Sequence, residues 1–156
     1  MVALIACSPE APAQNAPAKT SPTAETVDPR AQTGLREVPL TITSRTGAHH
    51  FTVEVAATPE QQEQGLMFRH SLAGDRGMIF PYDPPQQVAF WMKNTLIPLD
   101  IVYIRANGTI AGIVNAQPMD ITPLPSGEPV VLVLEIRGGR AAELGIKEAD
   151  KVSWTR

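Results

Sequence analysis

Residues 99–115, LDIVYIRANGTIAGIVN, decide the fold class of this chain. Two apolar runs, residues 99–104 and 110–115, flank the dipeptide Asn107-Gly108. Asn-Gly between apolar runs is the strongest short-range signal for a hairpin. The stretch therefore predicts a β-hairpin.

Three further stretches extend the β pattern. Residues 130–136 form a continuous apolar run, which is typical of a strand buried on both faces. Residues 38–42 and 51–55 alternate apolar and polar side chains on either side of Thr46-Gly47, so a second hairpin is expected. Shorter strands are expected at residues 78–80, 88–91 and 151–154.

One helix start is well defined by its capping residues. Thr58 is a favoured N-cap, Pro59 suits the first helical position, and Gln61 completes a capping box. We expect this helix to run to about Arg69, with Gly65 as a weak point.

The order of these elements sets the expected fold. A second short helix is expected at residues 140–144. With about seven to eight short strands and one or two short helices, the chain is expected to be mainly β (α+β). The expected architecture is a small, partly closed β-barrel or a sandwich over residues 37–156.

Length and charge limit the possible functions. The 156 residues suit a single domain with extensions. The formal net charge is −3, which gives no basic surface of the kind that binds nucleic acid, so no nucleic-acid partner is expected. No stretch approaches the roughly 20 apolar residues of a membrane span.

The N-terminal region resembles that of a bacterial lipoprotein. Leu4-Ile5-Ala6-Cys7 is similar to a lipobox, in which the cysteine is acylated, so residues 1–7 are expected to be a signal remnant. These residues lack a basic n-region and are short, so either translation starts upstream or the match is accidental. A stray terminal thiol is the alternative.

The segment after the cysteine is expected to be a disordered tether. Residues 8–36 contain five prolines and no aromatic residue, a composition that cannot bury enough apolar surface to fold. By the general rule for such lipoproteins, Ser8 after Cys7 indicates the outer membrane. The expected location is the periplasmic face of the envelope, with the membrane as partner through Cys7.

Residues 90–100 hold the densest mixture of polar and aromatic side chains. Trp91 offers an apolar face, while Lys93, Asn94 and Thr95 offer hydrogen-bond donors. Such a mixture suits recognition of a small polar ligand. The alternative is a strand end and a turn, in which Asn94 and Thr95 bond to local backbone.

Asp100 and Glu135 are carboxylates inside apolar strands. A buried carboxylate must be paired, protonated or placed at the mouth of the sheet. The candidate partners are Arg69, Lys93 and Arg137. The two acids could act as a catalytic acid and base, but a structural ion pair is the stronger expectation.

Metal and cofactor patterns are weak. Met67, Met78 and Met92 could form a Cu(I) site from thioether ligands, although methionine more often fills core gaps. His49 and His50 are sequence neighbours and point to opposite faces of a strand, so they cannot hold one zinc ion together. No metal site and no cofactor are expected.

Several of these motifs, in this order, resemble domain-of-unknown-function family 192, a family of uncharacterised and often exported proteins. The resemblance covers residues 38–154 and implies a compact, mainly β fold without an established activity. Ile136 to Arg140 depart from the plainer turn that is usual there. The motifs that carry the resemblance are Gly65-Leu66-Met67-Phe68-Arg69, Gly77-Met78-Ile79-Phe80, Phe90-Trp91-Met92-Lys93-Asn94-Thr95, Ile97-Pro98-Leu99-Asp100-Ile101 and Leu134-Glu135.

The leading hypothesis is a non-enzymatic envelope module that binds a small polar ligand or a protein partner. The alternative is a hydrolase or transferase that uses Asp100 and Glu135, and a third possibility is Cu(I) binding by methionines. The residues predicted to bind the ligand are Arg69, Trp91, Lys93, Asn94, Thr95, Asp100 and Glu135.

Overall fold

The computed structural model of the chain describes residues 28–155. It contains nine strands and two short helices within this range. The strands are β1 Glu37–Ser44, β2 Gly47–Val55, β3 Arg76–Gln86, β4 Ala89–Phe90, β5 Leu99–Ile104, β6 Ile110–Ala116, β7 Leu124–Pro125, β8 Val130–Arg137 and β9 Lys151–Trp154. The helices are α1 Pro59–Gln64 and α2 Arg140–Glu143.

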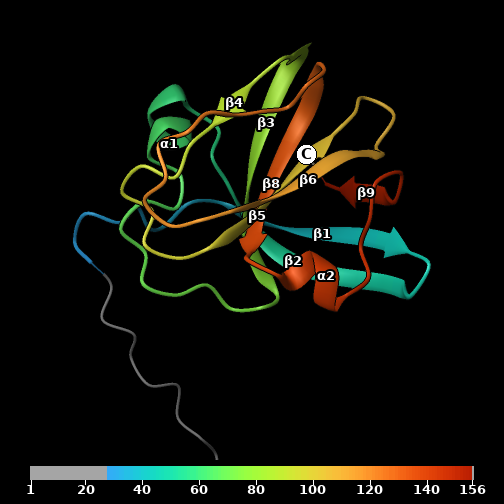
Figure 1. Ribbon diagram of the computed structural model, residues 1–156, viewed down its shortest axis with the longest axis horizontal. Coiled ribbons are helices and arrows are strands. Elements are labelled where there is room, and N and C mark those ends of the chain that lie inside the picture. The colour runs from blue at the N-terminus through green and yellow to red at the C-terminus, as the bar shows by residue number, and fades with distance from the viewer. Residues whose placement is uncertain (1–27, 156) are drawn as a thin grey trace, which may run out of the picture.

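Seven strands form one curled sheet in the order β6-β5-β8-β3-β2-β1-β9 (Figure 1). Its neighbours are antiparallel except β2 and β3. The two ends of the sheet approach each other, because Thr109 bridges Lys151 and the Val152 N–H donates to the Gly108 carbonyl. The mainly β, partly closed barrel predicted by the sequence is therefore confirmed. A second, two-stranded sheet joins β4 to β7.

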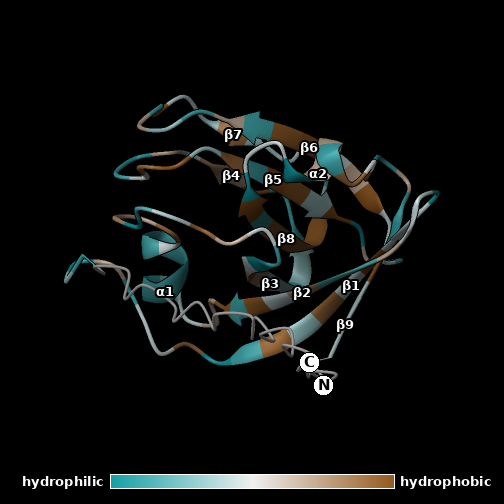
Figure 2. Cartoon of the chain, turned by 90° about the horizontal axis from the view of Figure 1, so that it is seen from below, coloured by the Kyte–Doolittle hydropathy of each residue, from teal (hydrophilic) through white to brown (hydrophobic). Residues whose placement is uncertain are grey.

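The central strands separate two apolar cores. One core, inside the curl, joins side chains of β1, β2 and β9 to Val102 of β5 and Ile136 of β8. The other core lies on the outer face and contains Met78, Ile101 and Val133. In Figure 2, α1 and the β4–β7 pair lie on the side of β8 away from β1 and β9. These segments cover the outer core.

The helix α1 begins as expected and ends early. The Thr58 hydroxyl accepts the Gln61 N–H, and the Gln61 side chain accepts the Thr58 N–H. The helix ends at Gln64 rather than near Arg69, because Gly65 adopts a positive φ of 49°. Glycine adopts such a conformation at little cost, so the predicted weak point is where the helix stops.

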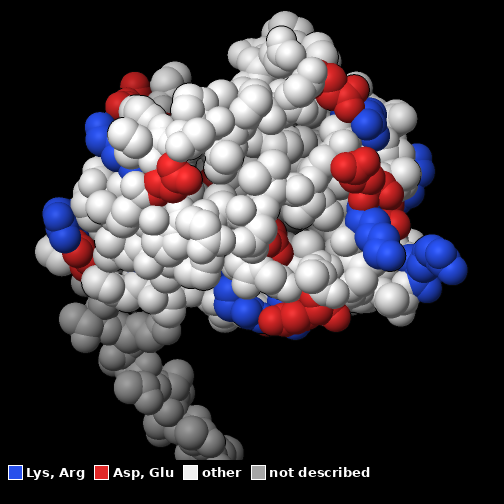
Figure 3. Space-filling view, in the orientation of Figure 1, with Lys and Arg blue, Asp and Glu red and all other residues white. Residues whose placement is uncertain are grey.

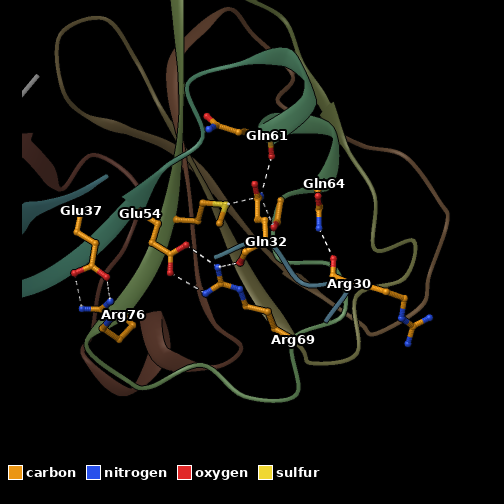
Figure 4. A network of polar contacts seen from close by, with 10 residues as sticks. Arg30, Gln32, Glu37, Glu54, Gln61, Gln64, Arg69 and Arg76 are labelled. Atoms are coloured by element: carbon orange, nitrogen blue, oxygen red, sulfur yellow. Dashed lines mark hydrogen bonds and ion pairs between the residues drawn. The ribbon is translucent and has the colours of Figure 1, made fainter. Parts of the chain in front are cut away.

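Residues 28–36 lie against the domain, so the described packing begins before the predicted boundary at residue 37. The Gln32 side-chain amide donates to the carbonyls of Gln61 and Gly65 at the end of α1 (Figure 4). The Arg69 guanidinium donates to the Gln32 carbonyl. Cys7 and most of the predicted tether lie outside the described residues. Within residues 28–155, no helix has the length and apolar character needed to cross a membrane.

Candidate functional site

A pocket of about 280 Å³ opens between α1, β3 and β4 on the outer face of the sheet. One side is formed by α1 and the turn after it, and the other by the aromatic residues of β3 and β4. Thr95 and Glu135 also line the pocket. The complete lining is Gln62, Glu63, Gln64, Gly65, Leu66, Met67, Phe80, Tyr82, Ala89, Phe90, Trp91, Thr95 and Glu135.

Glu135 is the buried charged group of this pocket. It lies in β8 between Met78 of β3 and Ile101 of β5, and only 4% of its surface is exposed. No residue of the described chain donates a hydrogen bond to its carboxylate or forms an ion pair with it. Loss of water around the carboxylate raises the pKa of Glu135 to about 8. At neutral pH the neutral acid therefore predominates.

Two tyrosines surround Glu135. The Tyr103 hydroxyl donates a hydrogen bond of 2.6 Å to the Leu124 carbonyl of β7. Burial, and then the nearby Glu135 charge, raise the pKa of Tyr82 to about 12 and raise the pKa of Tyr103 further. Both phenols stay protonated in the physiological range, so Glu135 is the group that can titrate there.

Aromatic rings form the walls of the pocket. The rings of Phe80 and Phe90 meet edge to face, with centroids 5.0 Å apart, and Phe90 meets Tyr103 at 6.4 Å. Trp91 stands at the rim with 47% of its surface exposed. The Lys93 ammonium lies over the Trp91 ring, 5.2 Å from its centroid.

Three of the seven predicted ligand residues lie in this pocket: Trp91, Thr95 and Glu135. Thr95 is buried within a turn, where its hydroxyl donates to the Lys93 carbonyl and its N–H donates to the Met92 carbonyl. Lys93 contacts the pocket residue Trp91 but does not line the pocket itself.

Asn94 holds the turn beside the pocket. Its φ is 55°, in the left-handed region that asparagine tolerates better than most residues. Its carbonyl accepts the Phe68 N–H at 2.8 Å, and its side-chain amide makes a weak contact with the Met67 sulfur at 3.9 Å. Asn94 therefore fixes the turn between the α1 region and the Trp91 segment.

Asp100 lies on the opposite face of the sheet from Glu135. In the β5–β8 register Asp100 pairs with Ile136, while Glu135 pairs with Ile101. Paired residues share a face and neighbours along a strand alternate, so the sheet separates the two carboxylates. They cannot act together as the acid and base that the hydrolase alternative requires.

The Asp100 carboxylate is fully bonded. It accepts the N–H groups of Gly139 and Ala141 at 2.9 and 2.8 Å, and the Asn115 amide at 2.8 Å. Gly139 and Ala141 open α2, whose N-cap position has no side-chain cap of its own. Asp100 thus supplies the missing cap from β5.

The predicted ligand residue Arg69 is also paired. Its guanidinium donates to both carboxylate oxygens of Glu54, at 2.8 and 2.6 Å, and to the Gln32 carbonyl (Figure 4). Arg137, considered as a partner for the buried acids, instead pairs with Glu143. Neither arginine lines the pocket.

The sequence did not reveal several pocket residues, chiefly Gln62, Phe80, Tyr82 and Phe90. Phe80 lies two positions after Met78 on β3, so the two side chains share a face. That alternation is visible in the sequence, but the pairing of Met78 with Glu135 is not. Without the pairing, nothing connects these rings to the carboxylate.

The methionines divide between core and pocket. Met78 and Met92 are fully buried in the outer core, whereas Met67 lines the pocket. Among the residues that the structure describes, no three His, Cys, Asp or Glu side chains gather as metal ligands.

Comparisons with known proteins find a family and solved relatives. The model of family DUF192, described as an uncharacterized ACR, matches residues 40–154. A crystal structure of a protein of unknown function from Novosphingobium aromaticivorans is 48% identical, with a TM-score of 0.77; the match covers 85% of this chain and 94% of that one. A Sinorhizobium meliloti protein, proposed to be a transcription regulator, is 38% identical with a TM-score of 0.76, and the match covers 79% and 97%. No curated protein matches.

Proposed function

Since this chain belongs to domain-of-unknown-function family 192, whose description names no activity, we propose a function from its own site: the pocket above Glu135 binds a small polar ligand. The observation that carries this proposal is the buried Glu135 carboxyl group, which lines the pocket without a protein partner. A pocket with aromatic walls and a few convergent polar groups is typical of ligand sites.

The two buried carboxylates of the chain allow an internal comparison. Asp100, which has a structural role, accepts three hydrogen bonds from protein groups. Glu135 is equally buried and receives none from the described residues, although burial of an unpaired carboxyl group costs free energy. Because Glu135 lines the pocket, its carboxyl group can take a hydrogen-bond partner from outside the chain.

The proposal is for a binding module rather than an enzyme. The acid–base pair needed for hydrolysis is divided by the sheet, as described above. Binding of a partner protein instead of a small ligand is the other form of the leading hypothesis. The small ligand is the form we propose, because Glu135 is buried with only 4% of its surface exposed and the pocket that it lines has a volume of about 280 Å³.

The charge distribution gives little support for nucleic-acid binding by this chain (Figure 3). On the face shown in Figure 3, Lys and Arg atoms lie beside Asp and Glu atoms rather than in one basic patch. Six arginines of residues 28–155 are paired with carboxylates: Arg30, Arg69, Arg76, Arg105, Arg137 and Arg140.

A ligand screen tests the proposal. The full chain is screened by thermal shift against cell-wall sugars, peptidoglycan fragments, amino acids, nucleotides and small amines. A ligand at about 100 times its Kd should stabilise the fold by roughly 2.7 kcal/mol and raise Tm by several degrees. The stabilisation should fall by about a third in Trp91→Ala, whose side chain is partly exposed, and stay unchanged in the control Glu148→Gln. A hit whose shift is the same in Trp91→Ala as in the unmodified chain would place binding elsewhere.

We also propose that the module is held at the cell envelope by a lipid on Cys7. The sequence Leu4-Ile5-Ala6-Cys7 and the proline-rich composition of residues 8–36 support this location. An envelope position would give the pocket access to small solutes of the periplasm.

A further inference from the structure

The ionisable carboxyl groups that line the pocket have no basic side chain beside them in the part of its lining that the structure describes. Its charged lining residues are Glu135 at the base and Glu63 on α1, and no Lys, Arg or His is among the described residues that line it. Glu63 is exposed, whereas Glu135 is buried. A ligand with a negative charge would therefore meet two carboxyl groups and no counter-charge.

The walls are aromatic side chains rather than cationic groups. Phe80, Tyr82, Phe90 and Trp91 come together from β3 and the β4 region. Aromatic faces attract cations through their quadrupole, and a carboxylate beside such faces completes a site for a positive group. The Lys93 ammonium already lies over one face of the Trp91 ring, so a ligand cation would meet the opposite face of Trp91 or the other rings.

Resting on the proposed function, we infer that the ligand is an organic ammonium cation, bound with its positive group between the Glu135 carboxylate and the aromatic walls. The side-chain oxygens of Gln62, Gln64 and Thr95 can accept hydrogen bonds from the rest of the ligand, since the donors of these side chains bond to carbonyls of the chain. The volume of about 280 Å³ is at the lower end for ligand pockets, so a small amine fits better than a drug-sized molecule.

Binding of a cation couples to release of a proton. Without a ligand, burial keeps Glu135 neutral at pH 7, because its pKa is about 8. A cation stabilises the ionised form, so the carboxyl group loses its proton to solvent as the ligand enters. The titratable groups that face Glu135 are Tyr82 of β3 and Tyr103 of β5, with Glu63 at the same pocket. Both tyrosines remain neutral through this range, so Glu135 is the source of the proton.

A neutral ligand would show the opposite dependence on pH. The protonated Glu135 could donate a hydrogen bond to a hydroxyl or carbonyl group, and that interaction would weaken as the acid ionises. The direction of the pH effect therefore distinguishes a cationic ligand from a neutral one.

The test is isothermal titration calorimetry of the full chain with choline and n-butylammonium. The neutral isostere of choline, 3,3-dimethylbutan-1-ol, is the matched control ligand. Affinity for the cations should rise about tenfold per pH unit between about pH 5.5 and 7.5 and level off above pH 8. Titrations in two buffers of different ionisation enthalpy should show release of about one proton per ligand in the lower range.

Two variants test the contributions of the Glu135 carboxylate and of the aromatic walls separately. Glu135→Gln should weaken cation binding at least tenfold at pH 8.5 and remove the pH dependence, with circular dichroism confirming the fold. Trp91→Ala, at a position that is 47% exposed, should weaken binding about fivefold. This second variant keeps the test valid if Glu135→Gln fails to fold. The matched control Glu148→Gln should bind as the unmodified chain does.

The outcomes separate this inference from the proposed function. Tight binding of the alcohol, with affinity that falls as pH rises, would overturn the ammonium assignment and keep the pocket as a ligand site. Cation binding that is flat with pH or unchanged in Glu135→Gln would also overturn it. If no compound of any charge binds in the calorimeter or the thermal screen, both proposals fail.

Discussion

At the residue scale, two buried carboxylates of one sheet have opposite roles. Asp100 is held by three hydrogen bonds and organises the start of α2. Glu135 has no partner in the described chain and stays largely protonated at neutral pH. The two carboxylates have different surroundings because they lie at adjacent positions of the β5–β8 register. Side chains at adjacent positions point to opposite faces of the sheet.

The raised pKa of Glu135 predicts a specific loss of stability with pH. Its ordinary pKa is 4.5 and its folded pKa is about 8, so the folded state holds a proton that the unfolded chain has released between these values. The free energy of unfolding should therefore be highest below about pH 4.5 for this group and fall by up to roughly 4 kcal/mol as pH rises to 8. The carboxylates with lowered pKa values, Asp28, Glu60, Asp120 and Glu143, act below this window.

Urea denaturation at several pH values between 5 and 9 measures this loss. Glu135→Gln keeps the shape of the side chain and removes the titration, so its stability should change little across the window. Above pH 8 it should exceed the stability of the unmodified chain. Equal pH dependence in both proteins would contradict the assignment of the shift to Glu135.

At the element scale, the sheet depends on close packing between β3 and β8. Gly77 of β3 lies opposite Ile136, and a Cβ added there would lie 2.6 Å from the Glu135 carbonyl oxygen. This contact involves backbone, which cannot move away easily. The close approach places Met78 beside Glu135 and thereby sets the base of the pocket.

Gly77→Ala should therefore destabilise the protein by about 2 kcal/mol or more. The matched control is Gly112→Ala in β6, where a Cβ meets nothing within 4 Å; its effect should be within about 0.5 kcal/mol. Chemical denaturation of both variants measures the difference. Equal stabilities would show that β3 and β8 can separate without cost.

The elements also show what the sequence could predict. Asn107-Gly108 predicted the β5–β6 hairpin, and the capping residues Thr58 and Gln61 predicted the start of α1, because these signals are local. The site was only partly predictable. Arg69 and Asp100 were predicted to bind the ligand because the sequence does not show their structural partners. These partners are Glu54 for Arg69 and the N–H groups at the start of α2 for Asp100.

At the scale of the whole molecule, residues 28–36 connect the domain to the N-terminal region that contains Cys7. Gln32 donates to two carbonyls at the end of α1, and Arg69 holds the Gln32 carbonyl. The path from the proposed anchor thus ends beside residues that line the pocket, such as Gln64 and Gly65.

The envelope location predicts acylation of Cys7. The chain, expressed from its natural start codon in a bacterial host, should incorporate labelled palmitate and partition into the detergent phase. Cys7→Ser should lose the label while the domain keeps its Tm, because the strands and helices that the structure describes lie within residues 37–154. Absence of label in the unmodified chain would contradict the lipid anchor.

The β5–β8 register has a further consequence for how the chain reaches its fold. If β5 paired with β8 one residue out of step, Asp100 would move into the aromatic outer core and Ile101 would move into the curl. That mispaired sheet would lose all three hydrogen bonds of Asp100 and leave α2 without its cap. Asp100 therefore selects against misalignment during folding, and the geometry around Glu135 depends on that selection.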